Sequence, residues 1–503
     1  MPASNTPTYP TVPQKGFFGH PRALLTLFGT EMWERFSYYG MKAILLFYMY
    51  GRVSEGGLGM DHSTAIALVS AYGASIYLSA IAGGWVADRL LGARKTVLCG
   101  GVLIMAGHIA LALPLAVPGL LASMVLIVSG TGLLKPNISN SVGSPYPPED
   151  RRRDAGFSIF YMGISVGAVL APYIVGTLGQ KVSYHLGFSI AAIGMFFGLV
   201  QYVLGWKHPD DVGSRAPNPL QLDAAGRRRV GIIGAVVGVV LLALVLAGIT
   251  GLLTLTGAVA LISIVCVVVP VCYFTTMMRS PKVTGVERSR LTAYIPLFIA
   301  AAFFWLIQEQ GASMLAAYAD TRTDLDAWGF AIPSSWFQSI GSAVLIVLTP
   351  VFATVWTRLG HRITTPQKFA VGLAFAGGSY LWLTIPALGA GQTPALWLTG
   401  SFALVTIGEM CLSPIGMSAT SSLAPAAFQN QTMGHWLAAS AAGQGVSAQI
   451  VQFYSPDHEI AYFGAIGGAA VVLGVAMLLL GPAITRRMRT PEAIGSDAVH
   501  ESI

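Results

Sequence analysis

Six side chains that can carry charge or form hydrogen bonds recur at helical spacing near the start of an otherwise apolar stretch. They are Glu31, Glu34, Arg35, Tyr38, Tyr39 and Lys42. An α-helix places these positions on one face, which extends about 16 Å at 1.5 Å per residue. Such a face can exchange protons and orient a polar ligand. A structural glutamate–arginine pair beside two interfacial tyrosines is the alternative, and it explains only one pair.

Three more charged residues, Lys135, Glu309 and Glu409, each interrupt an apolar stretch. An ionised group at the centre of a bilayer costs about 3 kcal/mol or more, so these residues are expected to face a shared cavity. With the first stretch they make three cations and four carboxylates. A carboxylate without a full partner binds a proton more readily, which makes the excess carboxylate a candidate proton carrier. Structural pairing is the alternative for each residue.

A cavity that displays both signs of charge suits a zwitterionic ligand. The cations can hold its carboxylate and the glutamates its ammonium group. Trp305 and Trp436 lie within a few residues of these polar groups. Lining the ligand pocket and anchoring the membrane interface are both open for them.

The composition indicates that a membrane surrounds these residues. The chain has 503 residues, 54% hydrophobic and 10% charged, with a mean hydropathy of +0.65, whereas soluble domains are about 25% charged. A membrane span needs about 20 mostly apolar residues. The sequence therefore predicts an all-α integral membrane protein with fourteen transmembrane helices, near 23–50, 64–88, 97–115, 119–140, 154–179, 184–206, 230–250, 252–278, 291–319, 335–357, 367–389, 395–423, 430–453 and 460–484.

The basic residues indicate the orientation of these spans. Of the 29 lysines and arginines, 23 cluster in alternate loops and in the terminal segments, whereas the intervening loops hold only Arg52, Lys181 and Arg322. Cytoplasmic loops are rich in lysine and arginine, so both termini are predicted to be cytoplasmic. This distribution accounts for the formal charge of +7 without nucleic acid binding.

A hydrophilic stretch follows the sixth span, and without the two spans directly after it the chain has six spans on each side. Asp88–Lys95 and Arg358–Arg362 are similar basic loops at corresponding places in the halves, as expected for a duplicated transporter. The two stretches after the linker lack ionisable groups and are expected to face lipid. The predicted organisation is a cytoplasmic N-terminal segment, an N-terminal six-helix bundle, a linker, an inserted two-helix hairpin, a second linker, a C-terminal six-helix bundle and a cytoplasmic tail, at residues 1–22, 23–206, 207–229, 230–278, 279–290, 291–485 and 486–503.

The sequence lacks the patterns of enzymes and metal sites. It contains no Walker motif, metal-ligand cluster or nucleophilic triad, so no catalytic or metal-binding residues are predicted. A membrane enzyme or a channel is the alternative of a different class. The four cysteines, at 99, 266, 272 and 411, have no disulfide or metal spacing and are expected to be small core residues.

One ten-residue segment is similar to the signature of a known family. Glu31–Gly40 reads EMWERFSYYG, and it resembles the ExxERFxYYG motif of the proton-dependent oligopeptide transporters, a branch of the major facilitator superfamily. The resemblance continues along the chain, through Gly130–Asn137, Phe160–Ile164, Phe304–Gln310, Trp336–Ser339 and Gly408–Pro414. It implies the major facilitator fold and, as in bacterial members, a hairpin inserted between the two bundles.

The resemblance also implies roles for individual residues. Lys42 would pair with Glu309 at the extracellular gate, and Lys135 with Glu409 near the cytoplasmic side. Glu31, Glu34, Arg35 and Glu309 would couple protons to binding. The positions implied for substrate binding are Tyr38, Tyr39, Lys42, Tyr77, Lys135, Ser165, Trp305, Glu309, Gly341, Glu409, Trp436 and Ser440.

The same resemblance implies a symporter that imports di- and tripeptides by alternating access. The proton gradient would be its energy source and no cofactor is expected. It would be a monomer in the bacterial inner (plasma) membrane, in contact with lipid and not with nucleic acid.

Three departures from the family pattern concern the substrate. Lys42 replaces the usual arginine, which keeps the charge but loses bidentate geometry. Ser165 and Gly341 stand where the family usually has asparagine. A non-peptide zwitterion or anion carried by the same fold is therefore the alternative.

Overall fold

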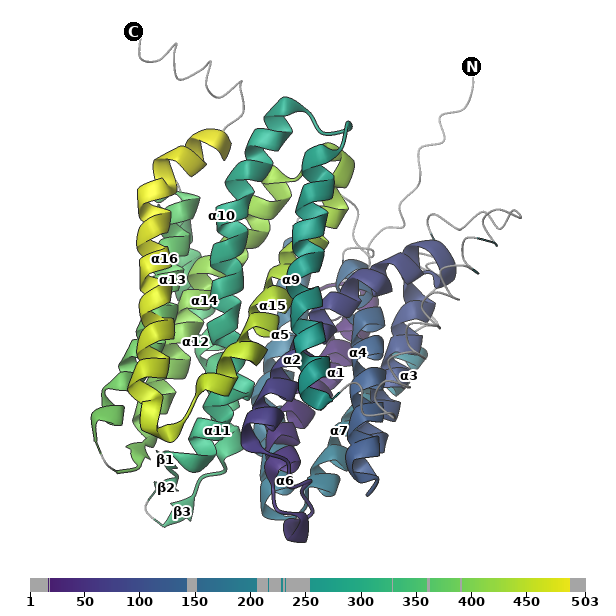
Figure 1. Ribbon diagram of the computed structural model, residues 1–503. Coiled ribbons are helices and arrows are strands. Elements are labelled where there is room, and N and C mark those ends of the chain that lie inside the picture. Colours follow the sequence, from purple (N-terminus) through teal and green to yellow (C-terminus); the bar gives the residue numbers. More distant parts are fainter. Residues whose placement is uncertain are drawn as a thin grey trace. The chain divides into compact units, whose positions relative to one another are not determined.

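The computed structural model describes residues 17, 19–142, 152–205, 216, 228, 231, 254–327, 329–359, 362–389 and 391–488. Long helices make up most of these residues (Figure 1). Eleven helical segments among them are long and apolar enough to cross a membrane. The expected all-α membrane architecture is confirmed. Apart from residue 231, the predicted span 230–250 lies outside the described residues, so the count of fourteen spans stays a prediction.

The helices before the linker match the predicted spans closely. Their bounds are α1 Arg22–Tyr50, α2 His62–Val86, α3 Ala93–Ala112, α4 Ala116–Ser141, α5 Arg152–Ala171, α6 Thr177–Lys181 and α7 Tyr184–Gly205. Two π-helical turns extend them, Ala87–Leu91 after α2 and Pro172–Gly176 between α5 and α6. A short 3-10 turn, Val53–Glu55, follows α1.

The later helices include one predicted span that the structure divides. Their bounds are α9 Leu255–Arg279, α10 Gly285–Gln308, α11 Met314–Thr321, α12 Gln338–Leu359, α13 Thr365–Thr384, α14 Ala395–Leu423, α15 Gln429–Ile450 and α16 Glu459–Met488. A 3-10 segment, Glu309–Ala312, separates α10 from α11. Two small sheets lie in loops: β1 (Thr323–Asp324) pairs in parallel with β4 (Thr393–Pro394), and β2 (Asp326–Ala327) pairs with antiparallel β3 (Phe330–Ala331).

Polar residues mark the starts of several helices. Thr284 and Glu287 form a capping box at the start of α10, in which the Thr284 backbone N–H donates to the Glu287 carboxylate at 2.8 Å. Asp61 accepts hydrogen bonds from the backbone N–H of Thr64 at 3.0 Å and from the hydroxyl of Ser63 at the start of α2. These bonds satisfy backbone donors that have no partner within the first turn of a helix.

The chain forms two compact units whose boundaries fall inside helices. The first contains the described residues of Met1–Met41, Ser79–Val175 and His185–Arg228, and the second those of Lys42–Leu78, Gly176–Tyr184 and Arg229–Ile503. Helices α1 and α2 are therefore each divided between the units. The predicted six-helix bundles do not coincide with these units and stay a prediction.

Facing glycines let helices cross with their backbones in contact inside each unit. In the first unit, a Cβ atom on Gly100 of α3 would lie 2.6 Å from the carbonyl oxygen of Gly130 on α4. In the second, a Cβ atom on Gly408 of α14 would lie 2.7 Å from the carbonyl oxygen of Gly372 on α13. Small residues at such crossings are typical of membrane helices. These are the third and fourth spans of the two predicted halves, which agrees with an internal duplication.

Helix α9, the second helix of the predicted hairpin, has one packed face. Cys266 is fully buried against Ala74 of α2 and Ala441 of α15. The side chain of Gln449 on α15 also donates a hydrogen bond to Ser263 at 2.9 Å. Other side chains of α9 are exposed, as expected for a helix that faces lipid: Ile264, Val268 and Val271.

The expectation of four buried cysteines is half wrong. Cys266 and Cys411 are buried, but Cys99 and Cys272 are exposed. Both exposed residues lie within the apolar helices α3 and α9. A lipid-facing position accepts a small apolar side chain as readily as a core position does, so an apolar stretch alone does not separate the two.

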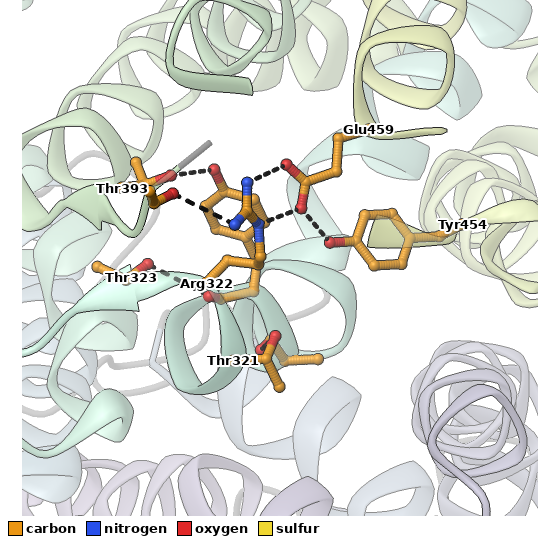
Figure 2. A network of polar contacts seen from close by, with 9 residues as sticks. Thr321, Arg322, Thr323, Thr393, Tyr454 and Glu459 are labelled. Atoms are coloured by element: carbon orange, nitrogen blue, oxygen red, sulfur yellow. Dashed lines mark hydrogen bonds and ion pairs between the residues drawn. The ribbon is translucent and has the colours of Figure 1, made fainter. Parts of the chain in front are cut away.

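A charged network joins the end of α11 to the start of α16 (Figure 2). The Arg322 guanidinium donates to both carboxylate oxygens of Glu459, at 2.7 and 3.1 Å, and the hydroxyl of Tyr454 donates to the same carboxylate at 2.8 Å. The hydrogen bond to Glu459 raises the pKa of Arg322, which stays charged. Burial and the neighbouring carboxylate raise the pKa of Tyr454, which stays neutral. The bidentate pair fixes these two helix ends to each other.

Candidate functional site

In the first unit, the polar face of α1 forms a buried charge cluster. Arg35 contacts both glutamates of its own helix: its Nη2 lies 2.8 Å from Glu34 Oε1 and its Nε lies 3.4 Å from Glu31 Oε1. All three side chains are at most 3% exposed. The second oxygen of Glu31 has no hydrogen-bond partner among the described residues. One cation thus lies between two carboxylates of its own helix, and Lys135 of the same unit also acts electrostatically on Glu31.

The aromatic residues predicted for this face lie beside that cation. The guanidinium carbon of Arg35 is 5.2 Å from the ring centre of Tyr38 and 6.0 Å from that of Tyr39. Lys135 and Ser165 belong to the same unit, on α4 and α5. The hydroxyl of Ser165 bonds within its own helix, to the carbonyl oxygen of Tyr161 at 3.3 Å.

In the second unit, Glu309 receives two donors from different helices. The Nζ atom of Lys42, in the C-terminal half of α1, lies 3.0 Å from Glu309 Oε2, and the hydroxyl of Tyr77 on α2 donates to Oε1 at 3.2 Å. Lys42 and Glu309 are 13% and 10% exposed. Three segments that are far apart in the sequence thus meet at one carboxylate, with one cation for one anion.

Glu409 has a partner that the sequence did not indicate. The amide nitrogen of Gln308 donates to Glu409 Oε2 at 2.8 Å. In the sequence this partner is only weakly indicated, by a glutamine beside Glu309 in an apolar span. The predicted partner of Glu409 is Lys135, which belongs to the other unit. That pair stays a prediction.

The remaining predicted contact residues lie on α10, α12 and α15 of the second unit. Trp305 is half-buried, with its ring 5.6 Å from that of Phe304. Trp436 is 3% exposed and packs over Gly416 of α14. Ser440 is buried and accepts a hydrogen bond from Gln444 at 3.2 Å.

Gly341, on α12, leaves free space where another residue would have a side chain. The nearest atom to a Cβ built there is the hydroxyl oxygen of Thr406 on α14, at 3.2 Å. A Cβ at this position would therefore make one tight contact and meet no other atom within 4 Å.

A cavity of about 500 Å³ in the described part of the chain is lined by none of these groups. Its lining is mostly apolar and contains no ionisable residue, so it is unsuited to the predicted chemistry: Leu25, Thr26, Trp33, Phe197, Val200, Gln201, Leu204 and Gly205.

Comparison with known proteins relates this arrangement to one family. A sequence model of the POT family (PTR2) matches residues 94–466. The uncharacterized transporter YclF of Bacillus subtilis (strain 168) is 51% identical over 95% of this chain and 97% of its own length. The di-/tripeptide transporter of Lactococcus lactis subsp. cremoris is 44% identical over 94% of this chain and 98% of its own length.

A solved structure extends the similarity to three dimensions. The crystal structure of a peptide transporter POT in complex with sulfate has a TM-score of 0.92 and 54% identity, and the match covers 95% of this chain and 98% of that chain. The predicted major facilitator fold is thereby confirmed. The family match covers most of the chain and the relatives are similar over nearly their whole length, so the chain belongs to the POT family.

Proposed function

We propose that this chain imports di- and tripeptides together with protons. The proposal rests on the contacts of the Glu309 carboxylate. Its Oε2 lies 3.0 Å from Lys42 Nζ, and its Oε1 accepts a hydrogen bond from the Tyr77 hydroxyl at 3.2 Å. As a member of the POT family, the chain is a transporter and not an enzyme. The name of the Lactococcus relative and that of the solved neighbour, a peptide transporter, support peptides as the substrate.

The ion pair at Glu309 can respond to both protons and substrate. Protonation of the carboxylate removes the attraction that holds Lys42, and the freed ammonium group can then bind the carboxylate of a peptide. We assign Glu31, Glu34 and Arg35 to the same coupling, because Arg35 contacts both glutamates and protonation of either one changes its pairing with the other. Two protonation states thus correspond to two states of the gate.

The predicted contacts complete the mechanism as a proposal. Lys135 and Glu409 would pair on the cytoplasmic side when the extracellular gate opens. The peptide would lie against residues named from the family resemblance: Tyr38, Tyr39, Tyr77, Ser165, Trp305, Gly341, Trp436 and Ser440. The bundles of residues 23–206 and 291–485 would alternate about this site.

The proton gradient can supply the energy for accumulation. One charge that crosses 100 mV contributes about 2.3 kcal/mol, which corresponds to roughly 50-fold accumulation at about 1.4 kcal/mol per tenfold. No cofactor is needed. We place the chain in a bacterial inner membrane as a monomer with both termini in the cytoplasm, following the loop charges.

The alternative is a transporter of the same fold for a non-peptide zwitterion or anion. Two observations favour it. The hydroxyl of Ser165 donates its hydrogen within its own helix, and Gly341 has no polar side chain. A ligand with fewer backbone amides than a peptide would lose less at these positions.

Uptake into liposomes tests the proposal. Purified protein is reconstituted with an inward proton gradient, and labelled dialanine and trialanine are followed with and without an uncoupler. We expect uptake that collapses with the uncoupler and is lost in Glu309→Gln but not in Glu55→Gln, which changes an exposed carboxylate. Folded protein that neither takes up these peptides nor is inhibited by them would contradict the proposal and favour the alternative.

A further inference from the structure

The span that carries Glu309 is interrupted at this residue. Helix α10 ends at Gln308, the segment Glu309–Ala312 forms a 3-10 turn, and α11 begins at Met314. A break inside the membrane frees backbone groups, so neighbouring elements must hold its conformation. The direction in which Glu309 points depends on the geometry of this turn.

Gln310, the residue after Glu309, is held by two tyrosines from other helices. Its amide oxygen accepts hydrogen bonds from the hydroxyl of Tyr380 on α13 and from that of Tyr462 on α16, both at 2.8 Å. Gln310 and Tyr380 are fully buried and Tyr462 is 6% exposed. The amide nitrogen has no partner among the described residues. The described hydrogen bonds of this side chain therefore all pass through its oxygen.

We propose that Gln310, clamped by Tyr380 and Tyr462, is a positioning residue for the carboxylate of Glu309. The clamp ties the interrupted turn to α13 and α16, while Glu309 reaches toward α1 and α2. Charged and titratable groups act on Glu309 from three elements. Lys42 on α1 and Tyr77 on α2 contact its carboxylate, and Glu409 on α14, which accepts a hydrogen bond from Gln308, interacts with it electrostatically. This inference rests on the proposed function, in which Glu309 exchanges the proton.

The clamp gives a reason for a glutamine at this position. One amide oxygen can accept two hydrogen bonds, and buried phenols need an acceptor because an unmade hydrogen bond there is costly. An apolar residue of the same length would leave both hydroxyls unpaired and free the turn to rotate. A small rotation at residue 310 moves the neighbouring carboxylate away from Lys42 and Tyr77.

The test removes the two hydrogen bonds to Gln310 and leaves Glu309, Lys42 and Tyr77 unchanged. Tyr380→Phe, Tyr462→Phe and the double variant each keep the ring and lose only the hydroxyl. Tyr318→Phe is the matched control: this buried tyrosine on α11 also loses a single hydroxyl bond, at 2.7 Å to Thr393. The rings of all three tyrosines pack against Phe463. Peptide uptake in liposomes is measured over a pH series with a proton gradient, and peptide counterflow is measured without one.

We expect proton-driven uptake to fall about tenfold in the double variant, as loss of two buried hydrogen bonds would allow. The midpoint of its pH profile should move by about half a unit or more. Counterflow, which needs no net proton movement, should stay within about twofold of the unaltered protein. Gln310→Met should reproduce these effects, and adding it to the double variant should cause little further loss, because the same interaction is already absent.

Several outcomes would overturn the inference. One is a pH profile in the double variant that coincides with that of Tyr318→Phe. Another is an equal fall in driven uptake and counterflow, which indicates damage to packing alone. If the double variant does not fold, the single variants decide by the same criteria. Glu309→Gln separates the two proposals: if it loses driven uptake while the tyrosine variants behave normally, only the inference fails, and if it keeps driven uptake, both fail.

Discussion

The pair of Lys42 and Glu309 is a partly buried salt bridge, so its two members depend on each other. Removing one charge leaves the other uncompensated, which costs about 3–5 kcal/mol where the group is desolvated. We expect Lys42→Met to lower the melting temperature of the purified protein markedly. Lys42→Met with Glu309→Gln should recover most of the loss, since neither charge remains. A double variant as unstable as the single one would contradict this.

Asp61 stabilises the start of α2 in a pH-dependent way. Hydrogen bonds from the hydroxyl of Ser63 and the backbone of Thr64 hold the pKa of Asp61 below its usual value. A carboxyl group with a lowered folded pKa contributes stability above its unfolded pKa of about 4, and this contribution is lost as the pH falls through the folded pKa.

We expect Asp61→Ala to cost about 1 kcal/mol of unfolding free energy at pH 7, as for other helix caps. At pH 3 the cost should be smaller, because the carboxylate is then partly protonated. Thermal unfolding at both pH values measures this difference, with Glu55→Ala as the exposed control. An equal effect at both pH values would show that the charge of the cap is not involved.

The sequence identifies residues of the site, but it does not give the contacts that they make. Lys42 and Glu309 are identifiable as charges in apolar stretches, although only the fold brings Lys42 Nζ to 3.0 Å from Glu309 Oε2. Gln308 and Gln310 flank Glu309 and look alike in the sequence. One donates to Glu409 and the other accepts from two tyrosines. Their directions depend on the break in the span, which hydropathy does not reveal.

At the scale of helices, the crossing of α13 and α16 provides a matched experiment. A Cβ on Gly377 would lie 2.6 Å from the carbonyl oxygen of Gly467, whereas a Cβ on the adjacent Gly378 would meet nothing within 4 Å. We expect Gly377→Ala to destabilise the protein by about 1–3 kcal/mol through overpacking. Gly378→Ala should be neutral or stabilising by up to about 1 kcal/mol, through helix propensity.

Thermal unfolding of the two alanine variants measures both effects under the same conditions. Similar melting temperatures for the pair would mean that the two helices separate easily and that the contact does not hold them. The comparison is strict because both glycines lie in the same helix and both changes add one methyl group.

Helix bounds were largely predictable because apolar length is a strong signal. The stretch predicted at 395–423 coincides with α14, whereas the stretch at 291–319 contains α10, a 3-10 turn and α11. The break was missed because the stretch as a whole is apolar enough for one unbroken span, although Glu309 and Gln310 are polar. The packed face of α9 was missed for a related reason: Cys266 and Cys272 look equivalent until α2 and α15 cover one of them.

For the whole molecule, the loop charges predict which ends of the helices face the cytoplasm. Val53, in the turn after α1, is 72% exposed, and Lys282, between α9 and α10, is also exposed. In a background without the exposed Cys99 and Cys272, we expect Val53→Cys to react with a membrane-impermeant maleimide in intact cells. Lys282→Cys should react only after the membrane is opened. The reverse pattern would overturn the predicted orientation.

The overall architecture followed from composition, span length and one ten-residue motif, and comparison with the POT family agrees with it. The arrangement of the halves could not be read in the same way. The compact units divide α1 between Met41 and Lys42, a boundary that no feature of the sequence marks. Such a boundary depends on which long-range contacts form, and these contacts are absent from local patterns.

The glycine crossings have a mechanical consequence. Where two backbones touch, no lipid tail or side chain separates them, so neither helix can bend or slide alone. Helix α13 has such a contact with α14 through Gly372 and Gly408, and with α16 through Gly377 and Gly467. These three helices should therefore move together as one rigid group. Because Tyr380 and Tyr462 tie Gln310 to α13 and α16, the turn at Glu309–Ala312 should move with these helices, and any displacement during a transport cycle must be absorbed elsewhere.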